Sequence, residues 1–158
     1  MRTVRDMAKN DEIWTPPKAI DPLLKYISIE AWYDALIWEM CPGKGVLAGY
    51  LKDSGFSVYY RLLDGLKWEA PKYDIIVTNP PWSKKHLFLQ RCVELNKPFA
   101  LLLPVRTLGV RRCQLWLDDV DVLFLAKRVD FTGGGAPYEA CAWFTRGLLN
   151  DRMVFQEE

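Results

Sequence analysis

The chain has 158 residues, a length typical of one folded domain, and half of its residues are apolar. Its formal net charge is +1, which neither requires a nucleic-acid partner nor excludes a local basic surface. The four cysteines form no CxxC pair and there is one histidine, so we expect no metal site and reduced thiols in a cytoplasmic protein. No apolar stretch is long enough to span a membrane, and we expect no membrane association.

Strand-like and helix-like segments alternate along the chain. Pro17 suits the first turn of a short helix within 14–27. Short apolar runs predict buried strands, and segments with helical spacing lie between most of them. The expected strands are 34–40, 56–60, 73–79, 98–105, 120–131 and 139–148, and the further expected helices are 46–55, 84–96 and 109–119.

This alternation predicts a single α/β domain over 1–158, built on a mostly parallel sheet with right-handed crossovers. Only a loop separates 120–131 from 139–148, so these two strands predict an antiparallel hairpin at the sheet edge. Residues 1–13 are polar, and we expect them to be flexible. Ligands of such sheets bind beyond the carboxyl ends of the strands, where two unusual segments fall.

The first unusual segment is EMCPGKG, residues 39–45. Gly43 and Gly45 let a ligand approach the backbone closely, and the following helix offers free N–H groups. Glu39 at the end of a strand suits an amine or hydroxyl of a ligand but would repel a phosphate. Because no GxGxxG pattern is present, the segment indicates a ligand that is not held through phosphates.

The second unusual segment is TNPPW, residues 78–82. Proline has no N–H, so Pro80 and Pro81 form a stiff turn that presents carbonyl acceptors. The Asn79 side chain and the Pro80 carbonyl can together accept both hydrogens of one exocyclic amine, and Trp82 offers a face for a planar base, a contact worth ~1–3 kcal/mol. The residues therefore predict methyl transfer from a sulfonium donor to an amino group on a flat heteroaromatic ring.

Taken together, these segments resemble the S-adenosylmethionine-dependent amino-methyltransferases, and most of all the adenine-specific DNA methyltransferases of the gamma arrangement. WTPPKAIDPLLKYI resembles their N-terminal motif, LIWEMCPGKGVLAGYL their cofactor motif and YDIIVTNPPW their catalytic motif. The resemblance covers roughly residues 14–147. It implies a Rossmann-like class I methyltransferase fold, with a mostly parallel seven-stranded sheet, helices on both faces and an antiparallel hairpin at one edge.

The resemblance also implies roles for individual residues. Asn79, Pro80, Pro81 and Trp82 would hold a flipped adenine of DNA, and Phe131 would be a second wall for the base. The residues implied to bind S-adenosylmethionine are Thr15, Glu39, Cys41, Gly43, Gly45 and Asp64. Base flipping costs a few kcal/mol, which contacts to phosphates must recover. The candidate phosphate contacts are Lys84, Lys85, Arg106, Arg111 and Arg112.

Three alternatives remain open at this point. Related motifs also serve enzymes that methylate guanine amino groups in RNA or a glutamine amide in a protein. A catalytically degenerate partner subunit is favoured by Arg61, which stands where the family has an acid for the cofactor ribose, and by Met40, where the family often has proline. We expect no separate target-recognition domain, so loops such as 129–139, a partner subunit or a homodimer would read the target. By analogy, so small a catalytic domain suits a phage or mobile element.

Overall fold

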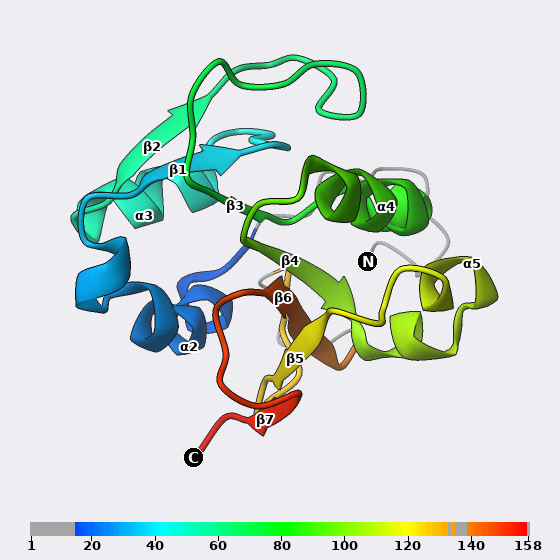
Figure 1. Ribbon diagram of the computed structural model, residues 1–158. Helices are drawn as coiled ribbons and strands as arrows, with labels where there is room; N and C mark the ends of the chain where they lie inside the picture. Colours follow the sequence, from blue (N-terminus) through cyan, green and yellow to red (C-terminus); the bar gives the residue numbers. More distant parts are fainter. Residues whose placement is uncertain (1–14, 133, 135–138, 158) are drawn as a thin grey trace.

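The structure is a computed structural model that describes residues 15–132, 134 and 139–157. The segment 1–13, which the sequence predicts to be flexible, lies outside the described residues. The described chain forms one mixed sheet flanked by helices (Figure 1). Among these residues, none of the helices combines the length and the apolar character that crossing a bilayer requires.

The sheet contains seven strands in the order β2-β1-β3-β4-β6-β5-β7. Strands β2, β1, β3 and β4 pair in parallel, whereas β6 runs antiparallel to both of its neighbours. The strands are β1 (Leu36–Glu39), β2 (Ser57–Tyr60), β3 (Ile75–Thr78), β4 (Phe99–Pro104), β5 (Asp121–Phe124), β6 (Cys141–Arg146) and β7 (Met153–Phe155). The predicted seven-stranded, mostly parallel sheet with an antiparallel hairpin is therefore confirmed.

The helices lie on both faces of this sheet, as predicted. Figure 1 shows α2 and α3 on one side and α4 and α5 on the other, and each pair is in mutual contact. The α-helices are α2 (Pro17–Ile27), α3 (Val46–Asp53), α4 (Lys85–Leu95) and α5 (Arg111–Gln114), and the 3₁₀ turns are η1 (Glu30–Trp32), η2 (Trp82–Lys84) and η3 (Val105–Gly109). The Trp143 indole of β6 donates to the Ala19 carbonyl at 2.7 Å and so anchors α2 to the sheet.

The burial of the central strands explains why their apolar sequences predict them correctly. Every residue of β3 and β4 is buried, which is typical of parallel strands covered on both faces. Aromatic packing adds to this core, because the Trp38 ring lies 4.9 Å from Tyr73 and 5.8 Å from Trp68. These contacts hold the long connection between β2 and β3 against β1.

The C-terminal part of the sheet differs from the prediction in two details. Strands β5 and β6 pair antiparallel as predicted, but β7 adds a further strand parallel to β5 and takes the position at the edge. The predicted strand 120–131 ends at Phe124, since residues 125–128 leave the ladder before Val129 bridges to Glu139.

The predicted helix 109–119 is also wrong in its extent. The chain after β4 forms the 3₁₀ turn η3, and only Arg111–Gln114 is α-helical. The Thr107 carbonyl accepts the Val110 N–H at 3.1 Å, which closes the 3₁₀ turn and breaks the helical path before α5 begins.

Candidate active site

The two unusual segments meet at the carboxyl edge of the sheet. Strand β1 ends at Glu39, and the neighbouring strand β3 ends at Thr78. Strand β4, on the other side of β3, ends at Pro104 and leads into η3. The cofactor-like turn, the Asn79 segment and the start of η3 therefore share one rim, as the sequence predicts.

Glu39 is the buried carboxyl group of this rim, and the residue is only 1% exposed. One carboxyl oxygen accepts the Thr78 hydroxyl and, at 3.0 Å, the Cys41 N–H. The other oxygen, Oε2, is buried and has no hydrogen-bond partner within the described part of the chain. Burial raises the pKa of Glu39 to about 8, against the smaller opposing effect of the bonds from Thr78 and Cys41. Glu39 thus links β1 to β3 and keeps one acceptor for a further donor.

The turn after Glu39 leaves space for a ligand. Gly43 and Gly45 have φ angles of 50° and 79°, which L side chains rarely adopt, and Gly45 immediately precedes α3. A Cβ atom at either glycine would meet nothing within 4 Å. Burial, followed by the nearby charge of Glu39, raises the pKa of Cys41, so this thiol stays protonated and is no nucleophile.

Asp64 lies on the connection between β2 and β3, beside the same turn. Its carboxylate accepts the Leu66 N–H at 3.0 Å and lies 3.9 Å from the Lys67 ammonium. The adjacent Gly65 packs so closely on Met40 that a Cβ atom there would lie 2.2 Å from the Met40 Cγ. The structure thus brings Asp64 to the cofactor-like turn, as the resemblance implies, although its side chain is half exposed.

The Asn79 amide is held by two side chains. Its Nδ2 donates to the Thr15 hydroxyl at 3.0 Å, and its Oδ1 accepts the Trp82 indole N–H at 3.1 Å. The same indole N–H also reaches the Leu102 carbonyl of β4 at 3.1 Å. Thr15, implied by the resemblance to contact the cofactor, therefore contacts the catalytic candidate in this structure.

Trp82 is more enclosed than a free stacking surface would be. Its side chain is 7% exposed, and its ring centroid lies 5.2 Å from that of Phe131 at an interplanar angle of 89°. Phe131 is itself buried. The structure thus brings together the two aromatic rings implied to flank a target base, in an edge-to-face arrangement.

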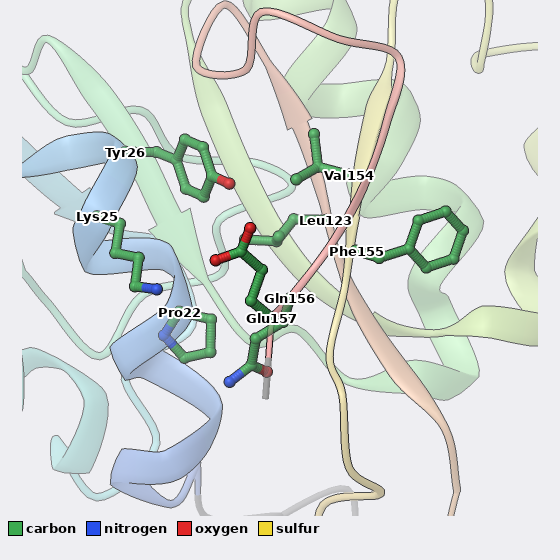
Figure 2. Close-up of a pocket in the computed structure, with 8 residues that line it drawn as sticks. All are labelled: Pro22, Lys25, Tyr26, Leu123, Val154, Phe155, Gln156 and Glu157. Atoms are coloured by element: carbon green, nitrogen blue, oxygen red, sulfur yellow. The ribbon is translucent and has the colours of Figure 1, made fainter.

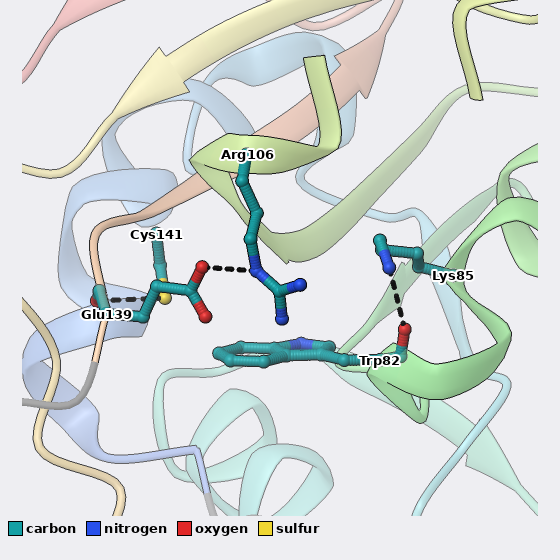
Figure 3. Close-up of polar contacts among 5 residues, drawn as sticks. All are labelled: Trp82, Lys85, Arg106, Glu139 and Cys141. Carbon is teal, nitrogen blue, oxygen red and sulfur yellow. Dashed lines mark hydrogen bonds and ion pairs between the residues drawn. The ribbon is translucent and has the colours of Figure 1, made fainter. Parts of the chain in front are cut away.

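Two of the predicted phosphate contacts have partners within the protein. The Arg106 guanidinium pairs with Glu139 at 2.5 Å, and Figure 3 shows its side chain pointing toward the indole of Trp82. The Lys85 ammonium donates to the Trp82 carbonyl at 3.3 Å. No sequence motif indicates Glu139, because its position opposite Arg106 depends on the pairing of β4 with β6.

The remaining predicted phosphate contacts form a basic surface, which we define as Lys84, Arg111 and Arg112. All three side chains are exposed, and no acidic residue in the described ranges forms a salt bridge with them. Burial and the charges of Arg112 and Lys85 lower the pKa of the nearby His86. The contact between α4 and α5 places this surface next to η2, which contains Trp82.

A separate hollow of about 220 Å³ lies between α2 and the C-terminal strand (Figure 2). Its lining includes Tyr26, Val154 and Glu157, and none of the predicted site residues. No group of three His, Cys, Asp or Glu side chains suited to a metal ion occurs in the part of the chain that the structure describes. The described residues bring amide, carbonyl, carboxyl and aromatic groups to the rim.

Comparison with solved structures identifies the class of fold as the Rossmann-like class I methyltransferase fold. The chain is similar to a candidate RNA methyltransferase from Pyrococcus horikoshii, with a TM-score of 0.61 and 13% identity over 84% of each chain. It is also similar to the 23S rRNA methyltransferase ErmE, with a TM-score of 0.59 and 16% identity over 88% of this chain and 72% of that one. A dimethyladenosine transferase from Plasmodium falciparum matches with a TM-score of 0.56 and 12% identity, over 84% and 62% of the respective chains. By sequence, no protein-family profile and no curated protein matches.

Proposed function

We propose that this protein is an S-adenosylmethionine-dependent methyltransferase that acts on the exocyclic amino group of adenine in DNA. The observation that carries the proposal is the Asn79 amide, held at the rim of a methyltransferase fold beside the Glu39 turn. The Pro80–Pro81 pair keeps this segment extended and supplies a further carbonyl acceptor.

The cofactor would lie along the turn from Glu39 to Gly45. The unpartnered Oε2 of Glu39 suits an amine or hydroxyl donor, and the open space at Gly43 and Gly45 suits close approach to the backbone. The Asp64 carboxylate would accept a hydrogen bond from the adenine amine of the cofactor. When bound, S-adenosylmethionine would supply a methyl group on sulfonium sulfur; the C–S electron pair would stay with sulfur as the target amine forms the new N–C bond and loses one proton to water.

The target amine would lie between Asn79 and Pro80. Asn79 Oδ1 has two lone pairs, of which Trp82 uses one, so one acceptor site remains for an amine hydrogen. The Pro80 carbonyl would accept the second hydrogen. This pair of bonds orients the nitrogen lone pair toward the methyl group, so catalysis comes chiefly from positioning.

A second candidate substrate is adenine in RNA. Three similar structures with TM-scores above 0.5 are described as RNA methyltransferases or a dimethyladenosine transferase, which favours this alternative. The sequence resemblance to DNA adenine methyltransferases favours DNA.

The test is transfer of labelled methyl groups from S-adenosylmethionine to unmethylated duplex DNA, single-stranded DNA and RNA, offered separately and in competition. We expect incorporation into DNA that Asn79→Ala abolishes, while calorimetry shows that the variant still binds the cofactor. Incorporation of label into RNA alone would contradict DNA as the substrate and would support adenine in RNA. Absence of S-adenosylmethionine binding at millimolar concentration would overturn the enzyme proposal and favour a degenerate partner subunit.

A further inference from the structure

The Trp82 indole N–H is shared between a side-chain acceptor and a backbone acceptor. Its distance is 3.1 Å to both Asn79 Oδ1 and the Leu102 carbonyl. The indole nitrogen can donate but cannot accept, so the Asn79 atom that faces it must be the carbonyl oxygen. The ring is enclosed, and its edge contact with Phe131 limits its rotation.

The opposite end of the Asn79 amide is fixed as well. Its NH₂ group donates to the Thr15 hydroxyl at 3.0 Å, and Thr15 is only 3% exposed. The Thr15 hydroxyl can donate or accept and therefore fits either orientation of the amide, so the indole N–H makes the selection: a rotation by 180° would place N–H against N–H at Trp82. The orientation that results is the one with Oδ1 available to accept an amine.

We propose that Trp82 is a positioning residue that orients the Asn79 amide through its indole N–H, in addition to any contact its ring makes with a base. This inference rests on the proposed function and deepens it. Leu102 lies in a fully buried strand, so its carbonyl is held in place. The hydrogen bond to this carbonyl fixes the Trp82 indole relative to β4, and the indole in turn orients the Asn79 amide.

Positioning and stacking predict different effects of Trp82→Phe. Phenylalanine keeps an aromatic face but has no N–H, so a pure stacking role would leave kcat unchanged or would raise only KM. A positioning role predicts that kcat for DNA falls about tenfold or more while KM stays within about twofold, because misorientation of a catalytic group acts on the reacting complex.

The matched control is Trp143→Phe. Trp143 is also a buried tryptophan that donates to a backbone carbonyl, but its partner is Ala19, outside the proposed site. We expect this variant to keep the wild-type kcat. An equal loss of kcat in both variants would assign the effect to general loss of packing and would overturn the proposal.

A second measurement is independent of catalysis. In ¹H–¹⁵N spectra, Trp82→Phe should shift the two Asn79 side-chain NH₂ resonances and speed their exchange with water, whereas Trp143→Phe should not. Replacing Trp82 by benzothienylalanine, which exchanges N–H for sulfur at nearly constant volume, gives the same test if Trp82→Phe does not fold. Unchanged Asn79 resonances would contradict the inference even if the protein methylates DNA, and changed resonances would support it even if no substrate is found.

Discussion

At the residue scale, the unusual feature of the site is a carboxyl group buried at the end of a strand. Glu39 bonds to Thr78 and to the Cys41 N–H, so one side chain couples the cofactor-like turn to the residue that precedes Asn79. Burial shifts its pKa from 4.5 to about 8. A raised pKa means that the folded state binds a proton more tightly than the unfolded chain does, and stability must then depend on pH.

The sign of this dependence follows from the direction of the shift. Between pH 4.5 and 8 the folded state holds a proton that the unfolded chain has released, so the free energy of unfolding falls as pH rises. Glu39 alone contributes a slope of about 1.4 kcal/mol per pH unit near the middle of that range. Urea unfolding at a series of pH values, at constant ionic strength, should show this slope in the wild type and its loss in Glu39→Gln. Parallel curves for the two proteins would show that Glu39 has an ordinary pKa.

At the element scale, the connection between β2 and β3 determines where Asp64 lies. Gly65 has no room for a side chain, because its Cβ position is 2.2 Å from the Met40 Cγ and 3.0 Å from the Met40 carbonyl. Met40 is 1% exposed and cannot move aside freely. The connection is therefore packed directly against the cofactor-like turn.

We expect Gly65→Ala to destabilise the protein by ~1–3 kcal/mol, since it overpacks this contact, and to weaken cofactor binding. Gly49→Ala is the matched control, because its Cβ would meet nothing within 4 Å and the residue lies inside α3. Alanine in a helix is more favourable than glycine by about 1 kcal/mol, so this variant should be more stable. Thermal unfolding and calorimetric titration measure both effects; equal stability of Gly65→Ala and wild type would refute the packing argument.

The elements differ in how well the sequence predicted them. The buried central strands β3 and β4 and the helix α4 follow from local apolar patterns, which their burial confirms. Strand β7 is short and largely exposed, and its apolar run of three residues, Met153–Phe155, is too short to predict a strand. The insertion of β6 between β4 and β5 depends on pairing between distant segments, so no local pattern could indicate it.

The same distinction holds for the site. The rim on which Glu39 and Asn79 meet follows from topology, because parallel strands end on one edge. The contacts of Trp82 with Leu102, and of Arg106 with Glu139, join residues 20 and 33 positions apart. Such contacts depend on side-chain directions that a motif does not encode, and the hydrogen bonds of the Trp82 indole to Asn79 and Leu102 became visible only in the structure.

At the scale of the whole molecule, the chain is near neutral, and three of its exposed basic side chains lie on or close to the elements around Trp82. The formal net charge is +1, yet Lys84, Arg111 and Arg112 are exposed together near η2. A nucleic acid bound there releases counterions, and the logarithm of its affinity falls linearly with the logarithm of salt concentration. The basic surface thus predicts where phosphates lie when a base reaches Asn79.

Replacing Lys84, Arg111 and Arg112 by glutamine should weaken binding and reduce the salt slope by about 1 per residue. Fluorescence anisotropy with a labelled DNA duplex between about 50 and 200 mM salt measures this slope. Lys72→Gln is the control, since Lys72 is exposed but precedes β3, at the opposite edge of the sheet. A slope that is the same in the triple variant and the control would place the phosphates elsewhere.

The proposed function requires that Asn79 and the Pro80 carbonyl hold the amino group of adenine for methylation. Its most direct test is to incubate the protein with S-adenosylmethionine and unmethylated DNA, digest the DNA to nucleosides and identify methylated bases by mass spectrometry. We expect N6-methyladenine with the wild type and none with Asn79→Ala. Methylation at a ring carbon of cytosine, or N6-methyladenine formed equally well by Asn79→Ala, would contradict it.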